Sequence, residues 1–383
     1  MKRQVTSRPT RAEISLGSLT SNFRRIKEFV GGDARFMAVV KADAYGHGAV
    51  RCAQALESAG IDWFGVAIPA EGVELRKKGI RKRILCLGSF WESQENLLLN
   101  QGLTPVIYRL DQAEAFDAAA KSRNSIAEVH LKIDTGMGRI GVRHDEMDPF
   151  LDKFAKFGNL HIEGVMTHFA AADEPDSIDF TREQIARFER ALAAVEARGH
   201  RPVYRDLSNS AGTIAFPDAL GNLVRLGGVL YGLTDDVLPP DVETPVFSPV
   251  MSLRTAIAHV KTVPEGETLG YGRTFATERE SLIATLPIGY QDGYPRVLSN
   301  KARVIIRGQY APVVGRVSMD WTLVDVTDIE GAEVGDDVVL IGSEGACEVR
   351  AEELGALSDT ISYEITCGIN RRVTRIYAEG GEE

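Results

Sequence analysis

Short apolar runs recur through the first 230 residues, and a segment with helical or turn character follows each of them. This regular alternation constrains the fold more than any other feature of the chain. The runs are residues 36–40, 63–67, 83–87, 104–108, 128–133, 161–166, 204–208 and 223–226. The intervening segments 49–59, 111–121 and 181–198 are helix candidates, and the last has apolar residues at helical spacing. Eight alternations of strand and helix predict an α/β fold, a (β/α)8 TIM-like barrel.

The sequence changes character after about Thr244. Valine-rich runs are now separated by turns that contain Gly, Pro and Asp, which predicts a mostly β C-terminal domain. These runs are residues 281–286, 302–306, 312–317 and 337–341. Pro239 and Pro240 would stiffen the connection. We therefore expect a barrel over residues 1–243 and a second domain over residues 244–383.

Composition excludes several classes of partner. The formal net charge of -10 disfavours nucleic acid, since no Lys/Arg run offers a local basic patch. No 18-residue apolar run is present, and residues 1–18 lack the apolar stretch of a signal peptide, so we expect a cytoplasmic protein without membrane association. The four cysteines form no Cys-x-x-Cys pair, so free thiols are expected and no metal site is indicated.

Polar residues follow five of the predicted barrel strands. In this fold the carboxyl ends of all strands meet at one mouth, where active sites lie. A single lysine at a strand end is usually solvated, but five polar strand ends facing one mouth indicate a functional site. The candidates are Lys41 after the first strand; Lys132, Asp134 and Arg139 at the fifth; His168 after the sixth; Asn209 and Ser210 after the seventh; and Arg225 on the eighth.

The loops after the seventh and eighth strands often hold a phosphate group. Here they contain Ser210, whose hydroxyl can donate to phosphate, and Gly227 with Gly228, which allow backbone N–H groups to approach an anion. A Gly-Gly pair elsewhere usually marks a plain turn, and a phosphosugar would use the same cup. A lysine at the mouth favours pyridoxal phosphate, because its amine can form a Schiff base with the aldehyde. Arg225 is placed to face the far side of the cofactor ring.

Longer motifs give a specific resemblance. Residues 40–48, VKADAYGHG, and residues 132–141, KIDTGMGRIG, look like two signatures of the alanine racemase family. Six further segments extend the match in the order of that family, so the resemblance covers nearly the whole chain. They are THF at 167–169, SNSA at 208–211, YG at 271–272, IGYQDG at 288–293, SMD at 318–320 and SYE at 362–364.

The resemblance implies an enzyme that binds pyridoxal 5'-phosphate and interconverts L-alanine and D-alanine, supplying D-alanine for peptidoglycan. Lys41 would carry the cofactor, and Arg225 would donate to its pyridine nitrogen. Because an arginine stays protonated, it would temper the ring as an electron sink and suppress side reactions. The remaining cofactor-binding residues implied are Tyr45, His168, Asn209, Ser210, Gly227, Gly228 and Tyr363.

Inversion at Cα needs a base on each face of the substrate. By resemblance Lys41 serves one face, and Tyr271 from the neighbouring subunit of a homodimer serves the other. A free tyrosine has a pKa of about 10, so a tuning partner is expected. His168 would link Tyr271 to Arg225; the alternative is a histidine that merely packs in the core.

The substrate carboxylate would be held by Arg139 and by the backbone at Met319, and Tyr290 and Asp320 would be further substrate-binding residues. In many relatives the lysine that matches Lys132 carries a carbamate made from carbon dioxide; an unmodified lysine is the alternative. The chain departs from the family pattern near the phosphate cup and elsewhere. The departures are Leu226, Gly228, Ser318 and Thr374, together with Arg273 close to Tyr271.

Three other functions stay open from the sequence. A non-catalytic pyridoxal-phosphate carrier would lack the second domain. A basic-amino-acid decarboxylase would have a carboxylate beside the pyridine nitrogen, at the position where this chain has Arg225. A racemase of broader specificity, acting on serine as well, would use the same residues.

Overall fold

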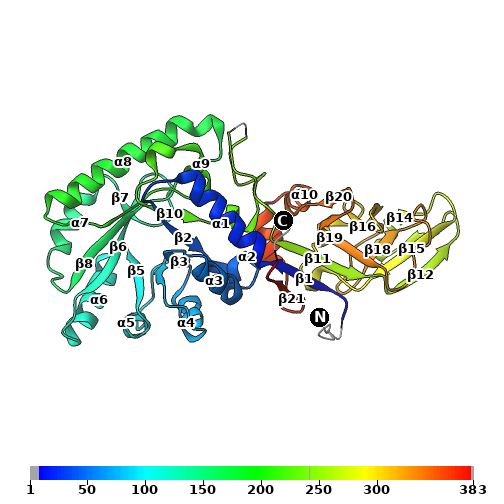
Figure 1. The fold of residues 1–383 in the computed structure, drawn as a ribbon, viewed down its shortest axis with the longest axis horizontal. Helices are drawn as coiled ribbons and strands as arrows, with labels where there is room; N and C mark the ends of the chain where they lie inside the picture. The colour runs from blue at the N-terminus through cyan, green and yellow to red at the C-terminus, as the bar shows by residue number, and fades with distance from the viewer. Residues whose placement is uncertain (1–7, 241, 381–383) are drawn as a thin grey trace.

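The computed structural model describes residues 8–240 and 242–380, and places a barrel beside a second, mostly β part (Figure 1). Each of the eight predicted runs forms a barrel strand, so the predicted barrel is confirmed. The strands are β2 (Arg35–Val39), β3 (Trp63–Val66), β4 (Arg83–Cys86), β5 (Leu103–Ile107), β6 (Ala127–Asp134), β8 (Leu160–Met166), β9 (Tyr204–Asp206) and β10 (Leu223–Leu226).

The barrel strands pair in parallel in the order β10-β2-β3-β4-β5-β6-β8-β9, and the short β7 (Val142–Arg143) pairs with β6. Between β9 and β10 the ladder is nearly closed. There the backbone N–H of Arg225 donates to Ser208 O at 3.0 Å. All eight carboxyl ends therefore meet at one mouth.

Helices cover the outside of the barrel. The three helices that the sequence predicted are present, with shifted ends. In α8, for example, Phe188, Leu192 and Val195 recur at helical spacing and are buried. The helices are α1 (Leu16–Val30), α3 (Ala49–Ser58), α4 (Pro69–Lys77), α5 (Glu95–Gln101), α6 (Leu110–Ser122), α7 (Met147–Phe154), α8 (Ile178–Ala197) and α9 (Ser210–Ala215).

Inward-facing side chains fill the barrel, because alternate residues of a strand point to the same face. Trp63 and Leu223 belong to one buried apolar cluster inside it. Nearer the mouth, the next inward-facing positions of these strands carry basic side chains. Arg225 stands two residues after Leu223, and Lys132 stands two residues after the buried His130. The barrel interior therefore changes from apolar to cationic toward the carboxyl ends of its strands.

The second part is built on a sheet with strand order β17-β16-β19-β11-β1-β21, while β20 pairs with β19. Its strands are β1 (Arg11–Ser15), β11 (Met251–Ala256), β16 (Arg303–Ile306), β17 (Gln309–Pro312), β19 (Asp337–Glu344), β20 (Cys347–Val349) and β21 (Thr374–Ala378). A smaller sheet and a hairpin contain β12 (His259–Val263), β13 (Thr268–Leu269), β14 (Phe275–Ala276), β15 (Ser281–Leu286) and β18 (Thr322–Asp325).

The first strand of the chain lies in the sheet of the second part. There β1 pairs antiparallel with β11 and parallel with β21, so segments from both ends of the chain join this sheet. The division at residues 243 and 244 stays a prediction, and residue 241 in the connection lies outside the described residues.

One predicted strand of the second domain is wrong in its bounds. The run 312–317 was expected to be extended, but β17 ends at Pro312 and Val313 makes only an isolated bridge to Val324. Gly315 follows with φ +71°, a conformation outside a regular strand. The apolar pattern there marks buried residues of a turn.

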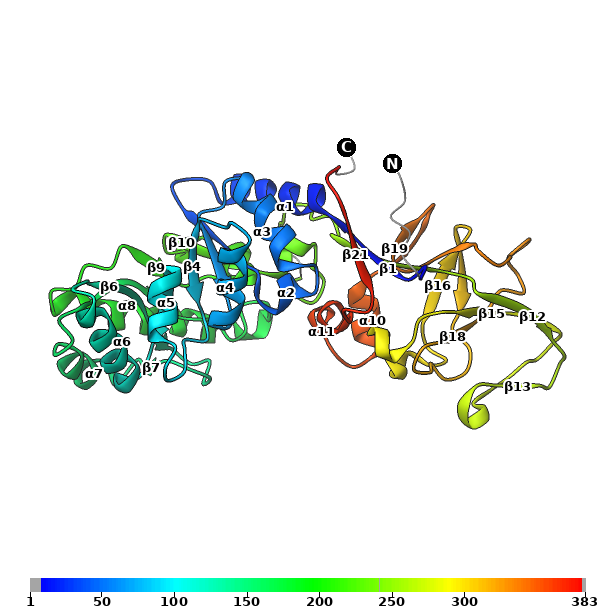
Figure 2. The same ribbon diagram turned by 90° about the horizontal axis from the view of Figure 1, so that it is seen from below.

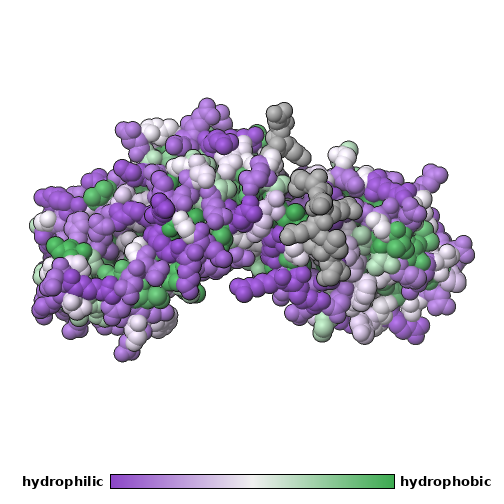
Figure 3. All heavy atoms as spheres, turned by 60° about the horizontal axis from the view of Figure 1, so that its bottom comes forward, coloured by the Kyte–Doolittle hydropathy of each residue, from purple (hydrophilic) through white to green (hydrophobic). Residues whose placement is uncertain are grey.

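Two short helices of the second part, α10 (Ala351–Leu357) and α11 (Ser362–Gly368), lie on the side that faces the barrel (Figure 2). The space-filling view shows two lobes, with mostly hydrophilic side chains on the face in view and a concave edge between them (Figure 3). Within the described residues, none of the helices has both the length and the apolar character needed to cross a bilayer.

Candidate active site

A cavity of about 600 Å³ opens at the carboxyl ends of the barrel strands, where the polar strand-end residues were expected to meet. Residues from both parts of the chain line it, since α11 contributes Tyr363 and Cys367. Ten of the sequence-predicted site residues are among its lining residues: Lys41, Tyr45, Lys132, Arg139, His168, Asn209, Ser210, Arg225, Gly227 and Tyr363.

Lys41 stands two residues after β2 and begins an unusual turn. The next three residues, Ala42, Asp43 and Ala44, have φ near +54° and ψ between 45° and 52°, a left-handed helical conformation that costs L-residues free energy. The turn is held by side chains, since Glu71 Oε1 accepts from Ala42 N at 2.8 Å. It brings Lys41 and Tyr45 to the same cavity.

Lys41 lies among other cations. Burial lowers the pKa of its ammonium, and the Arg139 guanidinium lowers that pKa further. The pKa of Lys132 is lowered well below its ordinary value by burial, then by Arg225 and Arg139. Arg139 lies at the exposed rim and has no hydrogen bond or ion pair with any described residue. A cavity with this charge is suited to anionic groups.

Arg225 is almost fully buried, and four groups hold its two terminal nitrogens. Nη1 contacts the carboxylate of Asp206, while Nη2 donates to Thr167 O at 3.0 Å and to Leu207 O at 3.1 Å. Burial lowers the pKa of Arg225 to about 9, which leaves the guanidinium charged at neutral pH. Its Nε–H has no partner among the described residues.

His168 lies beside Arg225, as the sequence predicted. Its Nδ1 is 3.1 Å from Arg225 Nη2, and a guanidinium can only donate, so Nδ1 accepts and the ring proton is on Nε2. Burial lowers the pKa of His168 well below its ordinary value, and Arg225 lowers it further. His168 is therefore a neutral imidazole with one free donor.

The expected phosphate cup has the required donors. Ser210 Oγ accepts from Gly227 N at 2.9 Å, which leaves the hydroxyl proton free to donate, and Gly228 N–H donates to the Tyr363 hydroxyl. Glycine is needed for this close approach: an added Cβ on Gly227 would lie 3.1 Å from the Tyr45 hydroxyl, and one on Gly228 only 2.5 Å from that of Tyr363.

These residues fit pyridoxal phosphate. The cup offers hydroxyl donors for a phosphate, Lys41 offers an amine of lowered pKa for the aldehyde, and the unpartnered Nε–H of Arg225 offers a donor for a ring nitrogen. Asn209 caps α9 by accepting from Gly212 N at 2.9 Å, and so fixes the start of the helix that carries Ser210.

Four predicted site residues do not reach this cavity within one chain. Tyr271 is 70% exposed, Met319 50% and Tyr290 40%, and Asp320 pairs with Arg372 at 2.7 Å. All four lie in the second part. Tyr271 directly follows the β13 strand, which Figure 2 shows at the far end of the second part from the barrel.

Some lining residues were not anticipated from the sequence. Asp173 and Asp236 line the cavity, and Asp206 lies behind Arg225. Asp206 stands two residues after Tyr204, which belongs to the apolar cluster inside the barrel, so strand alternation could have identified it as an inward-facing carboxylate. Cys367 stands one helical turn after Tyr363.

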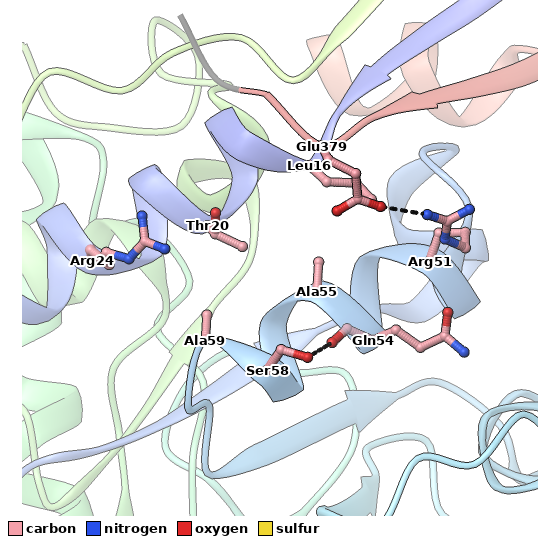
Figure 4. Close-up of a pocket in the computed structure, with 9 residues that line it drawn as sticks. All are labelled: Leu16, Thr20, Arg24, Arg51, Gln54, Ala55, Ser58, Ala59 and Glu379. Carbon is pink, nitrogen blue, oxygen red and sulfur yellow. Dashed lines mark hydrogen bonds and ion pairs between the residues drawn. The ribbon is translucent and has the colours of Figure 1, made fainter. Parts of the chain in front are cut away.

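A second depression lies outside the barrel, between α1 and α3 (Figure 4). Its two cations, Arg24 and Arg51, stand at opposite ends, and Arg51 already pairs with Glu379 at 2.8 Å. Its floor is formed by small or apolar side chains such as Ala55. Nothing in it resembles the convergent polar groups at the barrel mouth.

A (β/α)8 barrel with a lysine, a phosphate cup and an arginine converging on one cavity, joined to a β domain, defines the class of barrel-type pyridoxal-phosphate enzymes. The family models agree with this class. The model for the alanine racemase N-terminal domain matches residues 14–235, and that for the C-terminal domain matches residues 250–377. The chain belongs to the alanine racemase family of pyridoxal-phosphate-dependent isomerases.

Curated relatives and solved structures support this assignment. Alanine racemase from Halothermothrix orenii is 44% identical over 98% of each chain, and that from Symbiobacterium thermophilum is 46% identical over 98% of each chain. Alanine racemase from Streptomyces lavendulae superimposes with a TM-score of 0.90 at 35% identity, covering 98% of this chain and 98% of the other. A Bartonella henselae structure with covalently bound pyridoxal phosphate has a TM-score of 0.87 at 30% identity, covering 97% of this chain and 99% of the other.

Proposed function

We propose that the chain interconverts L-alanine and D-alanine, with Lys41 holding pyridoxal phosphate and the cup of Tyr45, Ser210 and Tyr363 holding its phosphate. The observation that carries the proposal is the convergence of Lys41, Arg225 and this cup on one cavity. Once bound, the cofactor would withdraw electrons from the Cα–H bond of the substrate, so that its proton can be removed.

Arg225 would determine how strongly the ring withdraws electrons. It offers the Nε–H to the ring nitrogen and does not supply a transferable proton at neutral pH. The ring would thus be a moderate electron sink, which favours return of the proton to Cα over side reactions. This argues against a decarboxylase, in which a carboxylate would stand at this position.

Two bases on opposite faces would carry the proton. Lys41, whose amine has a lowered pKa, serves one face. Tyr271 of the partner subunit serves the other, in a homodimer with shared sites. Support for this comes from the 70% exposure of Tyr271 in the single chain and from the free Nε2–H of His168, which is available to a phenol oxygen.

The substrate carboxylate would bind Arg139, which has no partner among the described residues, and the backbone at Met319 of the partner subunit. Tyr290 and Asp320 would bind the substrate from the same side. Lys132 would carry a carbamate, because its lowered pKa favours the neutral, nucleophilic amine. The carbamate would then orient Arg139.

Circular dichroism of L-alanine solution tests the activity. With purified protein and pyridoxal phosphate, the optical signal should decay to zero as D-alanine accumulates. A signal that persists at its initial value would refute the proposal. L-serine in the same assay tests the second candidate, a racemase of broader specificity. Supply of D-alanine for peptidoglycan and a cytoplasmic location stay predictions.

A further inference from the structure

Asp206 is a fully buried carboxylate that the proposed reaction does not use. It lies at the end of β9 and points into the barrel, because Tyr204, two residues earlier, belongs to the apolar cluster inside it. Its Oδ1 contacts Arg225 Nη1, whereas its Oδ2 is buried without a partner among the described residues. A buried carboxylate in this setting is retained by its interaction with a cation.

The Asp206 carboxylate stands behind the guanidinium, not between it and the cavity, since Arg225 lines the cavity and Asp206 does not. Together with Thr167 O and Leu207 O, it occupies the terminal nitrogens of Arg225. Only the Nε–H is left for a ligand. The contact thus fixes the direction in which Arg225 donates.

The same contact sets the charge at this position. The titratable groups that face Arg225 across the cavity are mainly basic side chains, Lys41, Lys132 and Arg139, with the neutral His168 alongside. The other carboxylates of the cavity are Asp173 and Asp236, and Asp236 is occupied by Ser362. Because the Asp206 carboxylate balances the positive charge of Arg225, this charge repels Lys41 less than an unpaired guanidinium would.

We propose that Asp206 is a positioning residue that both aims Arg225 at the cofactor ring nitrogen and neutralises its charge, so that the ring remains a weak electron sink. This inference rests on the proposed function, because it assumes that the cofactor binds in this cavity.

The test is a pH titration of the visible absorbance of the bound cofactor in holoenzyme. Asp206→Asn leaves the Arg225 charge unbalanced, which should lower the titration midpoint by about one pH unit at an effective dielectric constant near 20. Arg225→Gln leaves the carboxylate unbalanced and should raise the midpoint. The double variant removes both charges and should return it close to the wild-type value.

The double variant also protects the test against misfolding, because removing one partner of a buried pair is far more destabilising than removing both. Should Asp206→Asn fail to fold, comparison of Arg225→Gln with the double variant still reports on Asp206. Asp173→Asn is the matched control, since Asp173 lines the cavity without contacting Arg225, and its midpoint should move much less.

A second readout is the ratio of keto acid released to alanine racemised, which does not depend on how much protein is folded. Keto acid forms when the amino group stays on the cofactor and water supplies the ketone oxygen. With an unbalanced Arg225 the ring withdraws electrons more strongly, so Asp206→Asn should raise this ratio roughly tenfold, a change of about 1.4 kcal/mol in relative barriers.

Identical titration curves and keto acid ratios for Asp206→Asn and wild type, or for Arg225→Gln and the double variant, would overturn the inference. A wild-type protein that gives no visible absorbance with pyridoxal phosphate would instead refute the proposed function. The two failures are therefore distinguishable.

Discussion

Asp236, in the loop that follows the last barrel strand, accepts hydrogen bonds from both the backbone N–H and the hydroxyl of Ser362, the first residue of α11. The bond from the Ser362 hydroxyl is 2.7 Å long. Tyr363 comes next in the chain and meets Gly228 N–H in the phosphate cup. The barrel thus fixes the position of a residue that the second domain contributes to the cofactor site.

Removing this contact should weaken cofactor binding. Asp236→Ala leaves the first turn of α11 without its acceptor and should raise the dissociation constant of pyridoxal phosphate about tenfold, as expected for a hydrogen bond to a charged group. Fluorescence titration of cofactor-free protein measures it. Asp235→Ala is the control, because the Asp235 side chain is 57% exposed and its partners, Arg350 and the Thr234 hydroxyl, lie outside the cup. Equal constants for the two variants would contradict the prediction.

Gly46 ends the left-handed turn after Lys41 and touches α11. An added Cβ would lie 2.1 Å from Thr366 O, and φ is +84°. Gly60 has a similar φ of +92° but nothing within 4 Å of its added Cβ. Substitution by Ala should cost both positions about 1 kcal/mol from backbone strain.

Gly46→Ala should lose further stability from the backbone clash, and its thermal unfolding midpoint should therefore fall below that of Gly60→Ala. Differential scanning calorimetry of both variants provides the comparison. If the two midpoints are equal, α11 moves freely and does not support the turn.

The barrel was predictable because most of its strands are largely buried on both faces and read as short, mainly apolar runs. The inward positions of Lys132 and Arg225 follow from the same strands, since alternate residues share a face. The convergence of five strand ends on one cavity then follows from the closed parallel topology.

Other features depend on contacts that no local pattern reveals. The strand β1 precedes the barrel in the chain but pairs with β11, more than two hundred residues away. Likewise the pairing of Asp206 with Arg225 joins adjacent strands across the closing seam of the barrel. The left-handed turn was missed because Ala42, Asp43 and Ala44 have no intrinsic preference strong enough to announce positive φ values.

His130 should make stability depend on pH. It is fully buried, and neither ring nitrogen has a hydrogen-bond partner among the described residues, although Nε2 lies 3.9 Å from Glu163 Oε2. Burial lowers the pKa of His130 from 6.5 to about 3. Between those values the unfolded chain binds a proton that the folded chain does not. Stability therefore rises with pH and falls on acidification, by about 1.4 kcal/mol per pH unit for this group.

His130→Phe should remove that contribution. The phenyl ring keeps the flat packing on Gly164, whose added Cβ would lie 2.6 Å from the imidazole, and it loses no hydrogen bond. Urea unfolding at pH 4 to 7 should give a shallower dependence for His130→Phe than for wild type. His259→Leu, at an exposed position of β12, is the control. An unchanged slope for His130→Phe would refute the assignment.

Lys132 should react with carbon dioxide. Burial and Arg225 lower the pKa of its ammonium well below 10.5, which increases the fraction of neutral, nucleophilic amine. With ¹³C-labelled bicarbonate, the protein should give a carbamate carbon signal in the NMR spectrum, and Lys132→Arg should lose that signal. Wild-type protein without such a signal would show that the lysine stays unmodified.

The proposed sharing of active sites makes a prediction about mixed subunits. Lys41→Ala should abolish the visible absorbance of the bound cofactor, while Tyr271→Phe should keep the absorbance and lose racemisation. If Tyr271 acts in the partner's cavity, a dimer of one Lys41→Ala subunit and one Tyr271→Phe subunit has one site with both substitutions and one site with neither.

Equal amounts of the two inactive variants, unfolded and refolded together, should therefore regain about a quarter of wild-type activity, because half of randomly assorted dimers are mixed and each has one intact site. Each variant refolded alone is the control and should stay inactive. If Tyr271 instead served the cavity of its own chain, every site in the mixture would lack one base. In that case no activity would return, although the mixed dimers form.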